Sequence, residues 1–201
     1  QRQMCIRDSH HGEDLGMITL HVPGIHNVSN ALAALATSLE LGIDADTAAR
    51  GLSMFHGTNR RFQYKGEVNG FTIIDDYAHH PTEIEATLKA AANYPHRELW
   101  CVFQPHTYTR TKAFLTQFAQ ALSHADHIVL ADIYAARETD TLGISSQTLQ
   151  AEIEKLGKPC YYFPTFEEIE KFLLKKCMHG DLLITMGAGD VLKIGENLLS
   201  R

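Results

Sequence analysis

From residue 71 onward the sequence alternates short apolar runs with longer segments of helical spacing, and this alternation constrains the fold most. Apolar runs bounded by turn residues are typical of strands, and the segments between them are long enough for helices. The expected strands are 71–75, 99–103, 127–131, 160–163 and 181–186, and the expected helices are 81–93, 108–122, 145–156, 165–178 and 190–199. Strands that alternate with helices pair in parallel through right-handed crossovers. The sequence therefore predicts a Rossmann-like α/β domain with a mostly parallel sheet.

A different segment precedes this pattern and predicts a separate domain. Residues 17–22 have a strand pattern, 27–41 form an Ala/Leu-rich helix, and a second helix capped by Asp44 ends near Phe55. Residues 56–62 have linker composition, so we place a domain boundary near residue 57, between 11–57 and 58–201. Residues 1–10 carry no periodicity, and we expect them to be non-native or unstructured.

Composition excludes several classes of protein. With 18 Lys+Arg against 24 Asp+Glu, the formal charge is −6, which argues against a protein that coats nucleic acid. No stretch approaches the roughly 20 apolar residues that span a bilayer, so we expect no membrane partner. The four cysteines are scattered without a CxxC pair, as in proteins that keep reduced thiols. We therefore expect a cytoplasmic globular protein.

Ligands of such sheets bind outside the carboxyl ends of the strands, so the polar residues that follow each strand are the candidates for a site. The first strand of the alternating region is followed by Asp75, Asp76, Tyr77, His79 and His80. Two carboxylates and two histidines can hold a ribose, a metal or a phosphate. The alternative is that an aspartate caps the turn and the histidines are solvated.

Further polar groups follow other strands. His106 and Arg110 lie about one helical turn apart and could face one anion, although Arg110 could also be a surface residue near a capping threonine. Residues 187–190 form a glycine turn that opens a helix and could bind an anion or serve only as a tight turn. Residues 132–138 include Asp132, Arg137 and Glu138, which could be a substrate rim or a surface charge pair, and we favour the rim.

The first segment and the linker add two more groups. Asn27 and Asn30 are three apart near a helix start, next to His26, and amides there can read a purine edge, unless Asn27 merely caps the helix. Arg60 and Arg61 lie in the linker, where they could be solvated or could reach a phosphate when two domains close.

The order of these groups resembles that of the Mur ligases of bacterial cell-wall synthesis. The strings that carry the resemblance are His-Val-Pro-Gly-Ile-His-Asn-Val-Ser-Asn-Ala at 21–31, Asn-Arg-Arg-Phe at 59–62, Asp-Asp-Tyr-Ala-His-His-Pro-Thr-Glu at 75–83, Phe-Gln-Pro-His-Thr-Tyr-Thr-Arg-Thr at 103–111 and Gly-Ala-Gly-Asp at 187–190. The resemblance covers essentially residues 17–201. It implies an ATP-dependent ligase that phosphorylates a carboxylate and joins an amine to the acyl phosphate.

Within that family, the match favours the member that adds L-alanine to UDP-N-acetylmuramate. The alternative is the recycling member that adds a whole peptide to the same UDP sugar, which shares the His-His-Pro pattern. Tyr77 favours alanine, because we expect Phe more often at this position in the peptide-adding member.

The resemblance also implies roles for individual residues, which fall into three groups. The adenine contacts would be His26, Asn27 and Asn30, the other nucleotide and phosphate contacts Arg60, Arg61, Asp75, Asp76 and Tyr77, and the pocket for the alanine carboxylate and acyl phosphate His79 or His80, His106 and Arg110. Many relatives have Arg where this chain has Thr107, which leaves Arg110 as the one strong carboxylate clamp.

The sequence contains no GxxxxGK[ST] phosphate loop. The resemblance therefore implies the end of the family's central ATP-binding domain followed by its C-terminal domain, a fragment that we expect to be inactive alone. The Mg²⁺ ligands of the family belong to the part that this chain lacks, and we expect no metal ligand here.

Two other classes stay open at this point. A non-catalytic nucleotide-binding module could use the same fold. A dinucleotide-binding dehydrogenase is disfavoured, because residues 187–190 lack the third glycine of the fingerprint and follow the last strand rather than the first.

Overall fold

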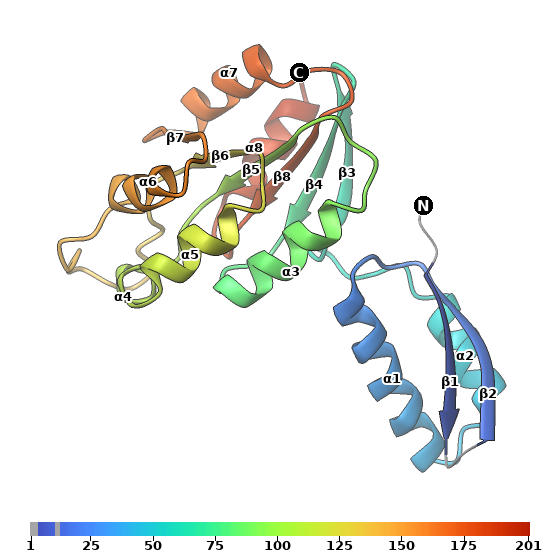
Figure 1. Cartoon of the computed structure of the whole chain (residues 1–201). Coiled ribbons are helices and arrows are strands. Elements are labelled where there is room, and N and C mark those ends of the chain that lie inside the picture. The colour runs from blue at the N-terminus through green and yellow to red at the C-terminus, as the bar shows by residue number, and fades with distance from the viewer. Residues whose placement is uncertain (1–3, 11–12) are drawn as a thin grey trace. The chain divides into compact units, whose positions relative to one another are not determined.

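The computed structural model describes residues 4–10 and 13–201 and divides into two compact units, Gln1–Asn59 and Arg60–Arg201 (Figure 1). This division falls two residues beyond the boundary expected near residue 57. None of the helices in the described ranges is both long and apolar enough to cross a membrane.

Unit 1 is built from one β-hairpin and two helices. Strands β1 (Met4–His10) and β2 (Glu13–Leu20) pair antiparallel, and helices α1 (Ile25–Glu40) and α2 (Ala45–Ser53) follow. Its core consists of Ile18 and Leu20, on one face of β2, and of Ala31, Leu35 and Ala48 from the two helices. For residues 1–10, expected to be non-native or unstructured, the second alternative is wrong over Met4–His10, which form β1. Residues 1–3 lie outside the described ranges, and the first alternative stays a prediction. A strand ladder is made by backbone groups, so it can form without a periodic side-chain pattern.

Unit 2 is an α/β domain around a six-stranded sheet, which confirms the predicted fold class. The strands are β3 (Gln63–Val68), β4 (Phe71–Asp76), β5 (Leu99–Phe103), β6 (His127–Leu130), β7 (Cys160–Tyr162) and β8 (Leu182–Met186). Their order is β3-β4-β8-β5-β6-β7, and every pair is parallel except β3 with β4.

Strand β3 was not among the expected strands. It is a hairpin partner of β4, and both residues of its turn, Asn69 and Gly70, have positive φ angles of 51° and 82°. Asn-Gly between two strands is the strongest short hairpin signal in a sequence, because both turn positions need that conformation. The Asn-Gly signal is present in the sequence, but residues 63–68 are mostly polar and contain a glycine, so they were not predicted as a strand.

Helices cover both faces of this sheet (Figure 1). The helices are α3 (Pro81–Ala91), α4 (Tyr108–Ala113), α5 (Leu115–Leu122), α6 (Ser146–Lys155), α7 (Phe166–Lys176) and α8 (Leu192–Leu199). Ile74 of β4 joins the core beneath α3, α5 and α6, whereas its neighbour Ile73 joins the core beneath α7 and α8. Because both faces are buried, the parallel strands are mostly apolar, which is why they were recognisable in the sequence.

The helix expected over 108–122 is two helices. Phe114 leaves helical geometry, with φ −115° and ψ 23°, and its ring packs against those of His80 and Phe118 at centroid distances of 4.9 and 6.5 Å. Helix α4 is therefore a separate unit of only six residues.

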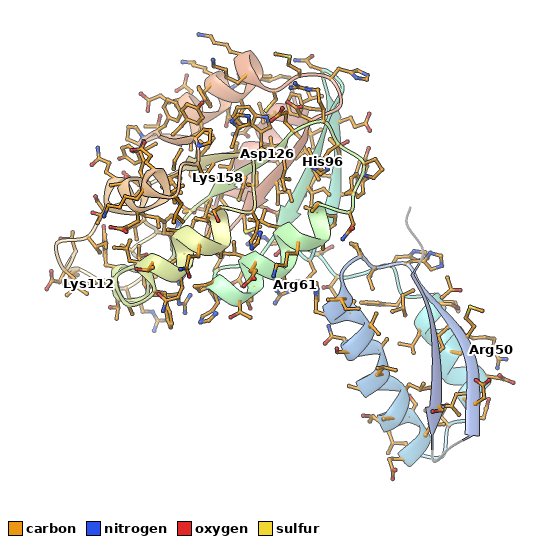
Figure 2. The ribbon with its side chains drawn as sticks, in the orientation of Figure 1. Arg50, Arg61, His96, Lys112, Asp126 and Lys158 are labelled. Atoms are coloured by element: carbon orange, nitrogen blue, oxygen red, sulfur yellow. The ribbon has the colours of Figure 1, made fainter. Side chains whose placement is uncertain are left out.

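The carboxyl ends of four strands meet at one edge of the sheet. In the ladder Asp76 is level with Met186, Met186 with Phe103, and Phe103 with Leu130. Figure 2 labels Arg61 and Lys112 at this lower edge, and His96, Asp126 and Lys158 at the opposite edge, where β5, β6 and β7 begin. The predicted site residues of unit 2 therefore gather at a single edge.

Candidate functional site

Asp75, near the end of β4, has protein partners for both carboxylate oxygens. Oδ2 accepts from Arg60 Nε at 2.9 Å, and Oδ1 accepts from the Thr185 hydroxyl of β8 at 2.8 Å. Arg60 also donates from Nη2 to the Gly187 carbonyl at 2.7 Å. Asp75 is buried. Through these hydrogen bonds, its carboxylate and Arg60 connect the start of unit 2 to β4 and to the end of β8. The nucleotide contacts expected of both residues stay predictions.

Asp76 connects the two loops that flank β4. Its carboxylate accepts from the backbone amides of Phe62 and Ala78, each at 2.8 Å. Burial raises the pKa of this carboxyl, although the two amide hydrogen bonds act in the opposite direction. Of the two interpretations weighed for the sequence, this geometry matches the capping interpretation, and the nucleotide role stays a prediction.

Tyr77 lies beside both linker arginines. The guanidinium carbons of Arg60 and Arg61 are 4.8 and 6.0 Å from the centre of its ring, a cation–π arrangement. Arg61 is exposed, and within the described ranges its guanidinium makes no hydrogen bond to protein. Arg61 is therefore the linker arginine whose donors are free for a ligand, whereas Arg60 is fixed.

The two adjacent histidines have different environments. His80 precedes α3, where its Nδ1 accepts from the Thr82 amide at 3.4 Å while Glu83 accepts from the His80 amide at 3.2 Å, forming a capping box. His79 instead turns its ring towards Tyr77 and His106, at centroid distances of 5.3 and 6.0 Å. The sequence left open whether His79 or His80 belongs with His106, and the structure places the ring of His79 beside that of His106. The role of either histidine stays a prediction.

His106 and Arg110 lie together at the end of β5. His106 extends the β5–β6 pairing by a bridge to Tyr134, and the two rings stack at 5.5 Å. Burial lowers the pKa of His106, and the positive charge of Arg110 acts in the same direction. The lowered pKa favours the neutral imidazole, and a neutral ring nitrogen can accept a hydrogen bond.

Three buried polar atoms at this edge have no hydrogen-bond partner among the described residues. They are His106 Nδ1, Arg110 Nη1 and Gln104 Oε1. Buried polar atoms are nearly always paired, so unpaired ones in one place point to a ligand or to water. Gln104 was not among the predicted site residues, although its place directly after β5 is the signal that could have found it.

The glycine turn at 187–190 approaches Gln104 closely. A Cβ on Gly187 would lie 2.8 Å from the Gln104 carbonyl oxygen, and one on Gly189 would lie 2.5 Å from Gln104 Oε1. A Cβ on Gly189 would also lie 3.1 Å from the ring of Tyr134, which the sequence reasoning missed as well. These glycines therefore serve close packing of the strand ends, and nothing in this geometry requires an anion.

The three residues predicted for adenine belong to unit 1. Asn30 donates from Nδ2 to Asn27 Oδ1 at 3.1 Å, so the two amides do share one face of α1. Asn27 donates to the Pro23 carbonyl at 2.6 Å, and the residue that precedes α1 is Gly24, so Asn27 does not cap the helix. His26 is exposed beside them. Among the described residues no group of three or more His, Cys, Asp or Glu is arranged to hold a metal.

The fold and this edge define an α/β domain with a polar, partly unsatisfied cluster where its parallel strands end. Residues 60–189 match the family model described as "Mur ligase, glutamate ligase domain", and the chain belongs to that family. It is 63% identical over 188 residues to the UDP-N-acetylmuramate–L-alanine ligase of Lachnospira eligens and 62% identical over 190 residues to that of Agathobacter rectalis. Each match covers 94% of this chain, which spans 41% of the length of either relative.

Solved structures of two ligases are also similar to this chain. The crystal structure of the UDP-N-acetylmuramate-alanine ligase of Thermotoga maritima superimposes with a TM-score of 0.80 at 30% identity, covering 96% of this chain and 41% of that one. A murein peptide ligase of Psychrobacter arcticus superimposes with a TM-score of 0.68 at 28% identity, covering 92% of this chain and 38% of that one.

Proposed function

We propose that the complete protein containing this chain joins L-alanine to UDP-N-acetylmuramate with the consumption of ATP. The names of the relatives from Lachnospira eligens and Agathobacter rectalis support this choice of substrates. In the first step the carboxylate of the UDP sugar attacks the γ-phosphorus of ATP, which forms an acyl phosphate and releases ADP. In the second step the alanine amine attacks the acyl carbon, an amide bond forms, and phosphate leaves with the electrons of the broken C–O bond.

The observation that carries this proposal is that two buried nitrogen atoms near the carboxyl end of β5, Arg110 Nη1 and His106 Nδ1, have no hydrogen-bond partner among the described residues. A free amino acid presents a carboxylate and an amine a few ångströms apart, and so needs a cationic donor beside a neutral acceptor. We assign the alanine carboxylate to Arg110, because guanidinium binds carboxylate through charge-assisted hydrogen bonds. We assign the amine side to neutral His106, with the His79 ring 6.0 Å away completing the pocket.

His106 also has the properties of a proton acceptor. The attacking amine must lose protons as the amide forms, and a neutral imidazole within reach can take one. Its lowered pKa keeps the ring neutral at working pH. His80 is already engaged as the cap of α3, so we give it a supporting role in holding the loop that carries His79.

Within unit 2, we propose that Arg61 contacts the phosphates of ATP, with Tyr77 beside it. Within unit 1, His26, Asn27 and Asn30 remain the proposed adenine contacts. Arg60, Asp75 and Asp76 would support this nucleotide set by fixing residues 60–62 and the end of β4. Mg²⁺ would neutralise phosphate charge during transfer. We place no Mg²⁺ ligand within this chain.

The test is the alanine dependence of the complete enzyme after Arg110→Ala. Loss of a charge-assisted hydrogen bond should raise the KM for alanine by about 10- to 100-fold while the KM for ATP changes less than about twofold. Lys155→Ala, which removes an exposed cation from α6, is the control and should change neither constant. Equal losses for alanine and ATP would reject the assignment of Arg110.

The same assay separates the peptide-adding alternative, which the Psychrobacter arcticus structure keeps open. ADP release by the wild-type enzyme is measured with UDP-N-acetylmuramate and either free L-alanine or a tripeptide. Stimulation by alanine alone supports the proposal, and stimulation by the tripeptide alone supports the peptide ligase.

A further inference from the structure

Glu138, in the connection between β6 and α6, makes contacts to which the proposed function gives no role. Its Oε2 accepts from the backbone amides of Tyr108 and Thr109 at 2.5 and 3.0 Å. These are the first two residues of α4, whose amides have no partner within the helix. Glu138 thus reaches across 30 residues of sequence to complete the start of the helix that carries Arg110.

Helix α4 needs such external support. It has six residues, whereas isolated helices shorter than about 12 residues are marginal in water. It also starts from Thr107, which has a φ of 67°, a conformation unfavourable for a residue with a Cβ. Its own cap is weak, because the Thr107 hydroxyl accepts from the Arg110 amide at 3.4 Å.

Residues 132–143, which we call the β6–α6 strap, supply that support along the whole of α4. Before the helix, the Thr107 amide donates to the Tyr134 carbonyl at 2.8 Å. At its start Glu138 accepts the two amides, and near its end Lys112 donates to the Leu142 carbonyl at 2.9 Å. Among the three acceptors that the strap supplies in these contacts, Glu138 offers a carboxylate, whereas Tyr134 and Leu142 offer backbone carbonyls. Hydrogen bonds from Thr109, that of its side chain foremost, hold the pKa of Glu138 below its usual range.

We propose that Glu138 is a positioning residue for the amino acid substrate: by fixing the first turn of α4, it holds Arg110 in the place where Arg110 can bind the substrate carboxylate. This proposal rests on the proposed function, because it takes Arg110 as the carboxylate clamp. Glu138 itself does not contact the substrate. Its loss should therefore weaken amino acid binding and leave ATP binding unchanged.

The experiment compares the complete wild-type enzyme with Glu138→Ala, Glu138→Gln and Thr139→Ala. Glu138→Ala should raise the KM for alanine by about tenfold with the KM for ATP within about twofold. Glu138→Gln keeps a carbonyl oxygen that can accept both amides, so it should recover most of that loss. Thr139→Ala removes the exposed neighbouring side chain of the strap and should match wild type.

Amide hydrogen exchange of the same proteins provides a readout that does not depend on turnover. Glu138→Ala should speed exchange within residues 106–113 and leave the central strands unchanged. An unchanged KM for alanine would overturn the proposal, as would equal increases of both KM values with faster exchange throughout unit 2. If the wild-type enzyme shows no alanine-dependent ADP release, the proposed function fails, and exchange confined to 106–113 still decides whether Glu138 holds α4.

Discussion

At the scale of single residues, the environment of His106 combines two neighbouring rings with partial burial. His106 lies 6.0 Å from the His79 ring and 5.5 Å from the Tyr134 ring. Burial lowers its pKa, the charges of Arg110 and His79 add to that effect, and the charge of Glu138 opposes it. The strap residue that holds α4 therefore also limits how far the His106 pKa falls.

This lowered pKa predicts a pH dependence of stability. The folded pKa of His106 lies below its ordinary value of 6.5, so between the two values the unfolded chain binds more protons than the folded one. The free energy of unfolding should therefore decrease as the pH falls through about 6.5, and level off below the folded pKa. His106→Asn removes this contribution.

Calorimetry of the 201-residue chain at about pH 8 and about pH 5 checks the prediction. The Tm of unit 2 should fall less in His106→Asn than in wild type over this interval. His124→Asn, at an exposed position two residues after the end of α5, is the control and should follow wild type. Identical pH dependences for wild type and His106→Asn would contradict the prediction.

At the scale of elements, the site depends on how closely the turn after β8 approaches the end of β5. Gly187 has a φ of 147°, and a Cβ there would lie 2.8 Å from the backbone oxygen of Gln104. The same turn carries the carbonyl that accepts from Arg60. The turn therefore links β8, β5 and the start of unit 2.

Gly187→Ala should destabilise unit 2 by at least about 2 kcal/mol, because backbone strain adds to a clash that no side-chain rotation can relieve. Denaturant unfolding measures the change. Gly51→Ala in α2 is the matched control, since a Cβ there meets nothing within 4 Å. It should leave unit 2 unchanged and stabilise α2 by up to about 1 kcal/mol through helix propensity. A Gly187→Ala protein as stable as wild type would refute the close-packing explanation.

At the scale of the whole molecule, the two units have separate cores. The core of unit 1 is drawn from β2, α1 and α2, and both cores of unit 2 are drawn from residues after Arg60. Unit 1 also leaves large apolar side chains exposed, among them Met17 at 70% and Met54 at 76%. A small core with exposed apolar residues provides little stability.

Residues 60–201 produced alone should therefore fold and unfold at the same temperature as they do in the whole chain. The full chain should show this transition together with a weaker one from unit 1, measured by calorimetry and by amide exchange in α1 and α5. A single transition in the full chain, lost when residues 1–59 are removed, would show that unit 2 depends on unit 1.

The sequence by itself determined the parallel sheet of unit 2 and the positions where its polar site begins. Strands that are buried on both faces are mostly apolar, so the residues Asp75, His106 and Gly187 mark the regions where three of these strands end. Only the tertiary structure decided which polar side chains are already bound to protein groups and which remain available to a ligand. Arg60 is bound to a carbonyl 127 residues away, and Glu138 to amides about 30 residues away, and no local pattern encodes such partners. Where several strands end side by side, the donor and the acceptor of a hydrogen bond come from different parts of the chain. The order of the strands in the sheet decides which parts are neighbours, so the sequence around one residue does not reveal its partner.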